Sequence, residues 1–196
     1  MKKIFLLLYV LFLLSGCSQN EIEKKLAQQN IYLVVVDIEN RLNKASDVGY
    51  ALSENLKNRL ENQNGISLEK RPKRATFNDE KKLFEKGKGV DYIITGVIDN
   101  SSTKKVDYPA RTRSEGGSST GWTEYRACVS GAIKIFKPPF TQSAKNLTFN
   151  DVCIKQNHEN YKEMLRRTAP KVVDEVFYEL KKFLVNDGKK HSFTRI

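Results

Sequence analysis

The stretch IYLVVVDI, residues 31–38, is apolar along nearly its whole length and rich in β-branched side chains. A strand with one face in water alternates apolar and polar residues, whereas a continuous run like this one suits a central strand covered on both faces. Central strands of this kind occur mainly in α/β domains, where helices cover the sheet. The positions of those helices and of the neighbouring strands therefore decide the rest of the fold.

A helix and further strands are predicted after this first strand. Apolar side chains recur every four positions from Val48 through Leu60, the pattern of one buried helix face. Ser46 is suited to cap the start of this helix and Gly65 to end it. The later elements show helical or strand periodicity in the same way: a short strand over 65–72, a brief helix from 78 or 79 through 86, a strand over 90–99 and a final helix over 160–185.

Pro170 interrupts the pattern of the final helix. Proline lacks the backbone N–H and its ring clashes with the preceding turn, so it kinks or ends a helix. We expect either a kink at Pro170 or a second helix that starts there with Thr168 as its cap.

Residues 101–121 are predicted to form a long, mobile loop. They are polar, they include the Gly-Gly-Ser-Ser run at 116–119, and they carry Lys104, Lys105, Arg111 and Arg113. Loops of this length are uncommon in compact domains unless they have a function. Binding through the loop and an excursion without a function both remain open.

Two strands are predicted on either side of KPPFTQ, residues 137–142. If the turn is centred in this segment, residues at equal distances from the centre oppose each other, which pairs Cys128 with Cys153. The apolar residues of the strand then share one face and both cysteines the other. Opposed Cβ atoms lie about 4.5–5.5 Å apart, so a disulfide can bridge them. We predict a Cys128–Cys153 disulfide that joins the two strands.

The order of elements predicts a single α/β domain with a mixed β-sheet packed with amphipathic helices. Its length fits one domain with a proper core. The expected organisation has four parts: a signal peptide over 1–16, a modified cysteine and tether over 17–30, the domain over 31–185 and a basic C-terminal tail over 186–196.

The start of the chain has the features of an export signal. Lys2 and Lys3 precede an apolar run over residues 4–14, which is too short to cross about 30 Å of hydrocarbon as a helix. The run ends in LLSGC, residues 13–17, which resembles the cleavage box of bacterial lipoproteins. The resemblance implies cleavage before Cys17, lipidation of its sulfur and acylation of the new N-terminus, hence stable membrane anchoring. An ordinary signal with a chance cysteine is the alternative.

Ser18 follows the cysteine. In bacterial lipoproteins an aspartate at this position favours retention at the inner membrane. The resemblance therefore implies an anchor in the outer membrane, on its periplasmic face.

The chain is strongly basic. Its formal net charge is +11, and removal of Lys2 and Lys3 with the signal leaves +9. Outside the cytoplasm such a surface meets no genomic nucleic acid, so we expect acidic envelope components as partners: lipid phosphates, lipopolysaccharide, anionic glycans or acidic protein faces. A solvated lysine-rich surface without a specific partner is the alternative.

No pattern in the sequence indicates an enzyme. His158 and His191 pair with no nucleophile, and no metal-binding spacing is present, so we expect neither a metal nor another cofactor. Asp37 and Glu39 could act as an acid and a base, but nothing indicates a pocket around them. We expect a binding protein.

Aromatic and basic residues gather around the predicted loop. Aromatic rings beside cations are typical of sugar-stacking surfaces and protein interfaces. The candidate binding residues are Lys104, Lys105, Arg111, Arg113, Trp122, Tyr125 and Arg126. Simple packing of Trp122 at the base of the hairpin is the alternative.

The segment GVDYIITGVIDN, residues 89–100, resembles the third strand of a known fold. The fold is shared by the curli secretion channel family, the lipoprotein activators of penicillin-binding proteins and the TolB N-terminal domain, and the matching residues are Gly89, Val90, Asp91, Tyr92 and Gly96. These residues are structural in those families, so the resemblance implies no catalytic role. Residues 101–121 lack the alternation of a pore-forming hairpin, which argues against a channel.

The resemblance implies a non-enzymatic lipoprotein that binds an envelope protein and supports the assembly or activity of a peptidoglycan synthase, a secretion machine or a surface appendage. The segment TEYRACVSGAIKIFKPP, residues 123–139, is also similar in style to the lipoprotein plug of the lipopolysaccharide export translocon. Direct binding of lipopolysaccharide or glycan is therefore the alternative function.

Overall fold

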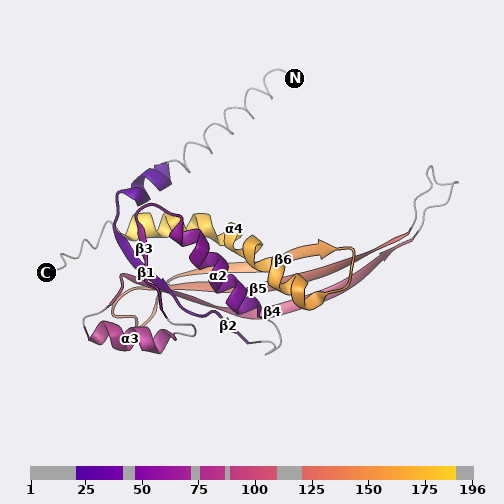
Figure 1. Cartoon of the computed structure of the whole chain (residues 1–196), viewed down its shortest axis with the longest axis horizontal. Coiled ribbons are helices and arrows are strands. Elements are labelled where there is room, and N and C mark those ends of the chain that lie inside the picture. The colour runs from indigo at the N-terminus through magenta and orange to yellow at the C-terminus, as the bar shows by residue number, and fades with distance from the viewer. Residues whose placement is uncertain (1–20, 42–46, 72–75, 87–88, 110–120, 189–196) are drawn as a thin grey trace, which may run out of the picture.

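The computed structural model describes residues 21–41, 47–71, 76–86, 89–109 and 121–188 (Figure 1). A short helix over residues 21–27, called the N-terminal helix below, comes first. The elements that follow are β1 (Ile31–Val35), β2 (Glu39–Asn40), α2 (Val48–Glu61), β3 (Ile66–Leu68), α3 (Phe77–Glu85), β4 (Tyr92–Tyr108), β5 (Trp122–Phe136), β6 (Ser143–Gln156) and α4 (Tyr161–Gly188).

The strands form one mixed sheet of six strands, in the order β3-β1-β4-β5-β6, with β2 paired to β4. Strand β1 runs parallel to β3 and β4, whereas β4, β5 and β6 run antiparallel to one another. The predicted fold class, a single α/β domain with a mixed sheet and amphipathic helices, is confirmed.

Strand β1 is covered on both faces, which explains its continuous apolar sequence. Leu33 and Val35 point into the main core, where they meet helices α2 and α4. Val34 points to the other face, into a smaller cluster that includes Phe140 and is packed against by Phe84 of α3. Figure 1 shows α2 and α4 on one side of the sheet and α3 on the other.

The N-terminal helix packs on the body. Leu26 is 1% exposed and belongs to the main core. The chain crosses directly from this helix into β1, where the Ile31 N–H donates to the Gly65 carbonyl at 2.9 Å. Residues 21–30, within the segment expected to be a tether, thus lie against the domain.

The predicted loop over 101–121 is wrong for its first eight residues. They continue β4 and pair with β5 as far as Tyr108, which lies opposite Trp122. A β-bulge at Asp99 separates this extension from the buried half of the strand. The extension escaped sequence analysis because most of its residues are exposed, so no apolar alternation marks it.

The β5–β6 hairpin contains two irregularities. One lies at Asp151, whose positive φ of 49° accompanies a β-bulge opposite Ser130, and the other lies near the turn. Together they set the register in which Cys128 opposes Cys153.

Helix α4 continues through Pro170 from Tyr161 to Gly188. No new helix starts at Pro170, and Thr168 is not a cap: it lies inside α4, where its hydroxyl donates to the Leu165 carbonyl at 2.5 Å. Among the described residues, no helix combines the length and apolar character needed to cross a membrane.

Candidate interaction surface

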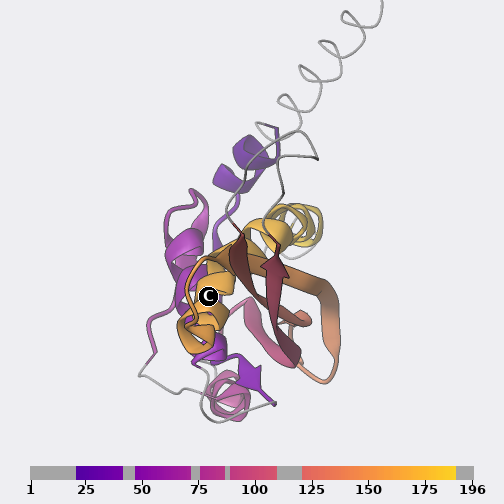
Figure 2. The ribbon, with the colours of Figure 1, turned by 90° about the vertical axis from the view of Figure 1, so that its right-hand side faces the viewer.

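Away from β1 and β3 the sheet narrows to a twisted ribbon, and only the tip of this ribbon extends beyond helix α4. We call residues 101–108 of β4, 122–130 of β5 and 151–156 of β6 the distal ribbon. Figure 1 shows it projecting from the body, and Figure 2 turns its free end toward the viewer. Opposed residues of an antiparallel pair share a face, so the pairing divides the ribbon into a face that α4 covers and an open face.

An aromatic pair lies at the end of the open face. The rings of Tyr108 and Trp122 are stacked, with their centroids 4.2 Å apart and their planes at 10°. Trp122 is nevertheless 50% exposed. Stacking holds the indole in place while leaving half of its surface in water, which is the arrangement of a preorganised contact residue.

A charged cluster borders the aromatic pair on the same face. Arg126 donates to the Glu124 carboxylate and, at 3.2 Å, to the Tyr108 hydroxyl. Lys155 of β6 lies 3.4 Å from the same carboxylate. The hydrogen bond from Arg126 is the main cause that lowers the pKa of Glu124 below its ordinary value. The cluster therefore fixes Arg126 beside Tyr108 and leaves the open face with more positive than negative charge.

The opposite face of the distal ribbon packs on α4. Tyr125 meets Tyr161 edge to face, with ring centroids 5.9 Å apart. Ala127, Ile154 and Met164 form a small buried cluster beside them. Burial is also the main cause that raises the pKa of Tyr161.

The predicted binding residues consequently do not form one surface. Trp122, Arg126 and Lys104, which lies opposite Arg126, share the open face. Tyr125 and Lys105, which lie opposite each other, belong to the face toward α4.

Cys17, Arg111 and Arg113 lie outside the described residues, as does His191. The expectations for these residues remain predictions.

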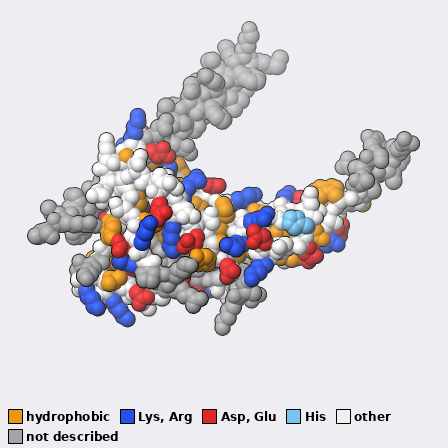
Figure 3. Space-filling view, viewed as in Figure 1, with side chains coloured by type: hydrophobic (Ala, Val, Ile, Leu, Met, Phe, Trp, Pro, Cys, Tyr) orange, Lys and Arg blue, Asp and Glu red, His pale blue; other side chains and the backbone are white. Residues whose placement is uncertain are grey.

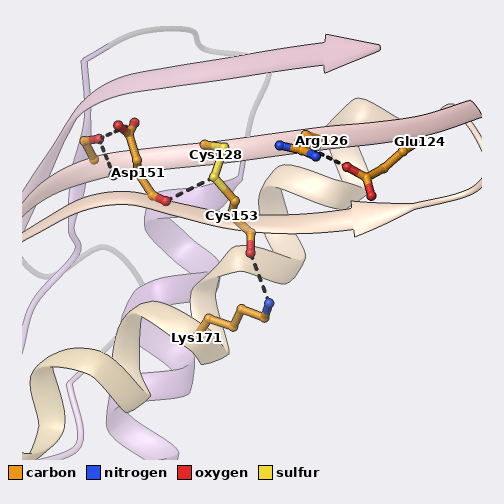
Figure 4. Close-up of a disulfide and its surroundings, with 7 residues drawn as sticks. Glu124, Arg126, Cys128, Asp151, Cys153 and Lys171 are labelled. Carbon is orange, nitrogen blue, oxygen red and sulfur yellow. Dashed lines mark hydrogen bonds and ion pairs between the residues drawn. A yellow bond between two sulfur atoms is a disulfide. The ribbon is translucent and has the colours of Figure 1, made fainter. Parts of the chain in front are cut away.

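The structure joins Cys128 and Cys153 by a disulfide on the open face, with Cα atoms 4.1 Å apart. It lies between the charged cluster and the bulge at Asp151 (Figure 4). Lys171 of α4 reaches across the sheet edge and donates to the Cys153 carbonyl at 3.0 Å. These contacts tie β6 to both β5 and α4 where the ribbon leaves the body.

The other sequence candidates show no catalytic arrangement in the part of the chain that the structure describes. His158 is exposed, next to the start of α4, and Glu39 is an exposed residue in the short β2. Within the described ranges, no three His, Cys, Asp or Glu side chains come together in a way that could hold a metal ion.

Sequence analysis missed Tyr108, Glu124 and Lys155. A signal for Tyr108 exists: it and Trp122 each lie seven residues from Glu115, beside the Gly-Gly run. Two aromatic residues placed symmetrically about a glycine-rich segment fit a hairpin. Glu124 and Lys155 come together only through the β5–β6 register.

No protein-family model matches the chain, and no curated protein matches it by sequence. Solved structures of similar shape come from several bacteria. A hypothetical protein from Chlamydia trachomatis matches with a TM-score of 0.47 and 10% identity, over 83% of this chain and 99% of that chain. A lipoprotein from Neisseria meningitidis matches with a TM-score of 0.39 and 10% identity, over 76% of this chain and 99% of that chain.

A minor lipoprotein from Acinetobacter baumannii matches with a TM-score of 0.37 and 9% identity, over 79% of this chain and 94% of that chain. All three TM-scores are below 0.5, so the lipoprotein hypothesis continues to depend on the residues that end at Cys17. The resemblance to the curli channel and penicillin-binding-protein activator families stays a prediction as well.

Proposed function

We propose that this chain is a non-enzymatic lipoprotein, anchored through Cys17 to the periplasmic face of the outer membrane, which binds another envelope protein through the open face of its distal ribbon. Binding would support the assembly or activity of a larger envelope complex. The observation that carries the proposal is the half-exposed Trp122, stacked on Tyr108 and bordered by Arg126.

Aromatic residues and arginine are enriched at interface positions that dominate binding energy. Trp122 offers a large apolar contact, and the stack with Tyr108 reduces the entropy lost when a partner immobilises it. The paired charges of Glu124, Arg126 and Lys155 would lie at the polar rim of such an interface.

The test is photo-crosslinking in the native cell. A photoreactive amino acid at Lys104 or Ser102, on the open face beside Arg126 and Cys128, should capture a defined protein that mass spectrometry identifies. Trp122→Ala should then weaken the purified complex roughly 30-fold, the effect of losing about 2 kcal/mol at a central contact.

Tyr50→Ala is the matched control, because Tyr50 is an aromatic residue of similar exposure, 42%, on helix α2. It should leave the complex unchanged. Retention of full affinity by Trp122→Ala, or equal losses in both variants, would contradict the proposed surface. Mass spectrometry of the mature N-terminus tests the anchor, since an unmodified Cys17 excludes it.

The alternative is direct recognition of lipopolysaccharide or another anionic glycan. A stacked, exposed aromatic pair can pack against a sugar ring, and Lys104 and Arg126 can pair with its phosphates or carboxylates. In that case the purified protein alone should bind the glycan, and binding should weaken steeply as salt rises.

A further inference from the structure

The N-terminal helix is fixed to the body by an ion pair and by a buried leucine on one of its faces. Glu23 forms an ion pair with Lys181 of α4, at 2.9 Å, while Leu26 is buried in the core. Directly after the helix, the Gln29 side chain donates to the Val185 carbonyl of α4, also at 2.9 Å. The helix therefore moves with the domain and does not extend the reach of the segment before it.

The covalent distance between an anchor at Cys17 and this fixed helix is short. Four residue steps separate Cys17 from Glu21, where the helix begins. A chain extends at most about 3.6 Å per residue, so Glu21 can lie no more than about 14 Å from the modified cysteine. This limit holds for any conformation of the connecting residues.

That limit keeps the domain at the membrane surface. The polar layer of one leaflet is about 5–7 Å thick. With the Cys17 backbone at the hydrocarbon edge of this layer, where its acyl chains begin, Glu21 can emerge no more than about 7–9 Å beyond it. This distance is within the Debye length of about 8–10 Å, over which charged groups still sense the headgroups. Lys24 and Lys25 follow within about 6 Å along the helix axis.

The charges on the helix suit contact with anionic headgroups. Its two carboxylates are paired with lysines, Glu21 with Lys25 and Glu23 with Lys181. With Lys24 included, three lysines stand against two carboxylates, so this surface has a net positive charge. Lys24 is exposed and has no ion pair among the described residues. Figure 3 shows Lys or Arg side chains at this end of the body, with the distal ribbon at the opposite end.

We infer that the surface formed by the N-terminal helix and the adjoining end of α4 rests on the bilayer, with Lys24 and Lys25 against the phosphates of anionic phospholipids. The distal ribbon is then directed away from the membrane, and Trp122 faces a partner on the far side. The inference rests on the proposed lipidation of Cys17.

Lysine footprinting of the lipidated full-length protein tests it. The protein is incorporated into vesicles of phosphatidylcholine, with or without phosphatidylglycerol, and labelled with an amine-reactive reagent before mass spectrometry. Lys24 and Lys25 should react several-fold more slowly in phosphatidylglycerol vesicles than in detergent micelles. Lys104 and Lys155 of the distal ribbon are internal controls, whose rates should stay unchanged.

A spacer variant provides the matched comparison. Insertion of a flexible Gly-Ser segment of about 20 residues between Ser18 and Gln19 leaves the described structure intact. It lengthens the connection between Cys17 and Glu21 to several times its maximum extension. Lys24 and Lys25 should then become more reactive toward the rate seen in micelles.

Three outcomes would overturn the inference. The first is equal reactivity of Lys24 and Lys25 in vesicles and micelles, and the second is equal protection with and without phosphatidylglycerol. The third is protection of Lys104 and Lys155, which would place the ribbon on the membrane. Failure of the protein to float with the vesicles would instead refute the lipid anchor, and with it the proposed function.

Discussion

Loss of the Cys128–Cys153 disulfide should destabilise the domain without changing its fold. The two cysteines are 25 positions apart in the sequence. A cross-link that closes a loop of about 25 residues lowers the entropy of the unfolded chain by about 12 cal/mol/K. This corresponds to about 3.5 kcal/mol of stabilisation at 25 °C. Hydrogen-bonded pairs continue on both sides of the disulfide, from Tyr125 with Gln156 to Phe136 with Ser143, so the folded hairpin persists without it.

Urea unfolding with and without reductant measures this effect. With a denaturant slope of about 2 kcal/mol/M, a loss of about 3.5 kcal/mol lowers the midpoint by about 1.8 M. The Cys128→Ser/Cys153→Ser variant should unfold at the midpoint of the reduced protein, and reductant should not move it further. An unchanged urea midpoint on reduction of the wild type would refute the reasoning. So would a reductant-induced shift in the double variant as large as the shift in the wild type.

Three further predictions concern the packing of the body and the charged cluster. Gly65→Ala should lower the free energy of unfolding by at least about 1–3 kcal/mol, because Gly65 has a φ of 84° and a Cβ there would lie 1.9 Å from the Leu26 carbonyl oxygen. The control is Asn64→Ala, at the exposed neighbouring position. It should change stability by less than about 0.5 kcal/mol in the same urea titration. Leu26→Ala should cost about 2–5 kcal/mol and speed hydrogen exchange across residues 21–27, and unchanged exchange would contradict the docking of this helix. The pKa of the Glu124 carboxyl is lower in the folded protein than in the unfolded chain, so its ionised form stabilises the fold above the unfolded pKa. This stabilisation is lost as pH falls through the pKa of the folded protein. Glu124→Gln should therefore show a smaller fall in urea midpoint than wild type between about pH 6 and pH 3.

The body of the fold was predictable because its buried residues follow simple apolar patterns in the sequence. Residues 31–35 are apolar without interruption, and the structure covers them on both faces. The start of α3 was placed a residue or two late, although Thr76 and Asp79 form a capping box that the sequence displays. Local patterns thus gave the number and order of the elements better than their ends.

The β4 part of the distal ribbon was harder to predict because it is held by pairing with β5 and not by burial of its own side chains. Residues 101–105 of β4 are all exposed, so no hydrophobic period separates them from a loop. Their strand conformation is imposed by β5, whose inward side chains, such as Ala127 and Val129, are buried against the body. The charged cluster was unpredictable for a related reason: it needs the registers of both β4–β5 and β5–β6, including a bulge at Asp151.

The same separation between buried body and exposed ribbon suggests how the molecule divides its tasks. Side chains in the main core hold the domain together, and replacing them would change stability. Trp122 contributes little to that core, because half of its surface is exposed and its ring contact is with Tyr108 at the ribbon's end. In the proposed function, this exposed half of Trp122 is the surface that a partner contacts. Because the N-terminal helix lies at the other end of the sheet, that contact and a membrane anchor at Cys17 can be made at the same time.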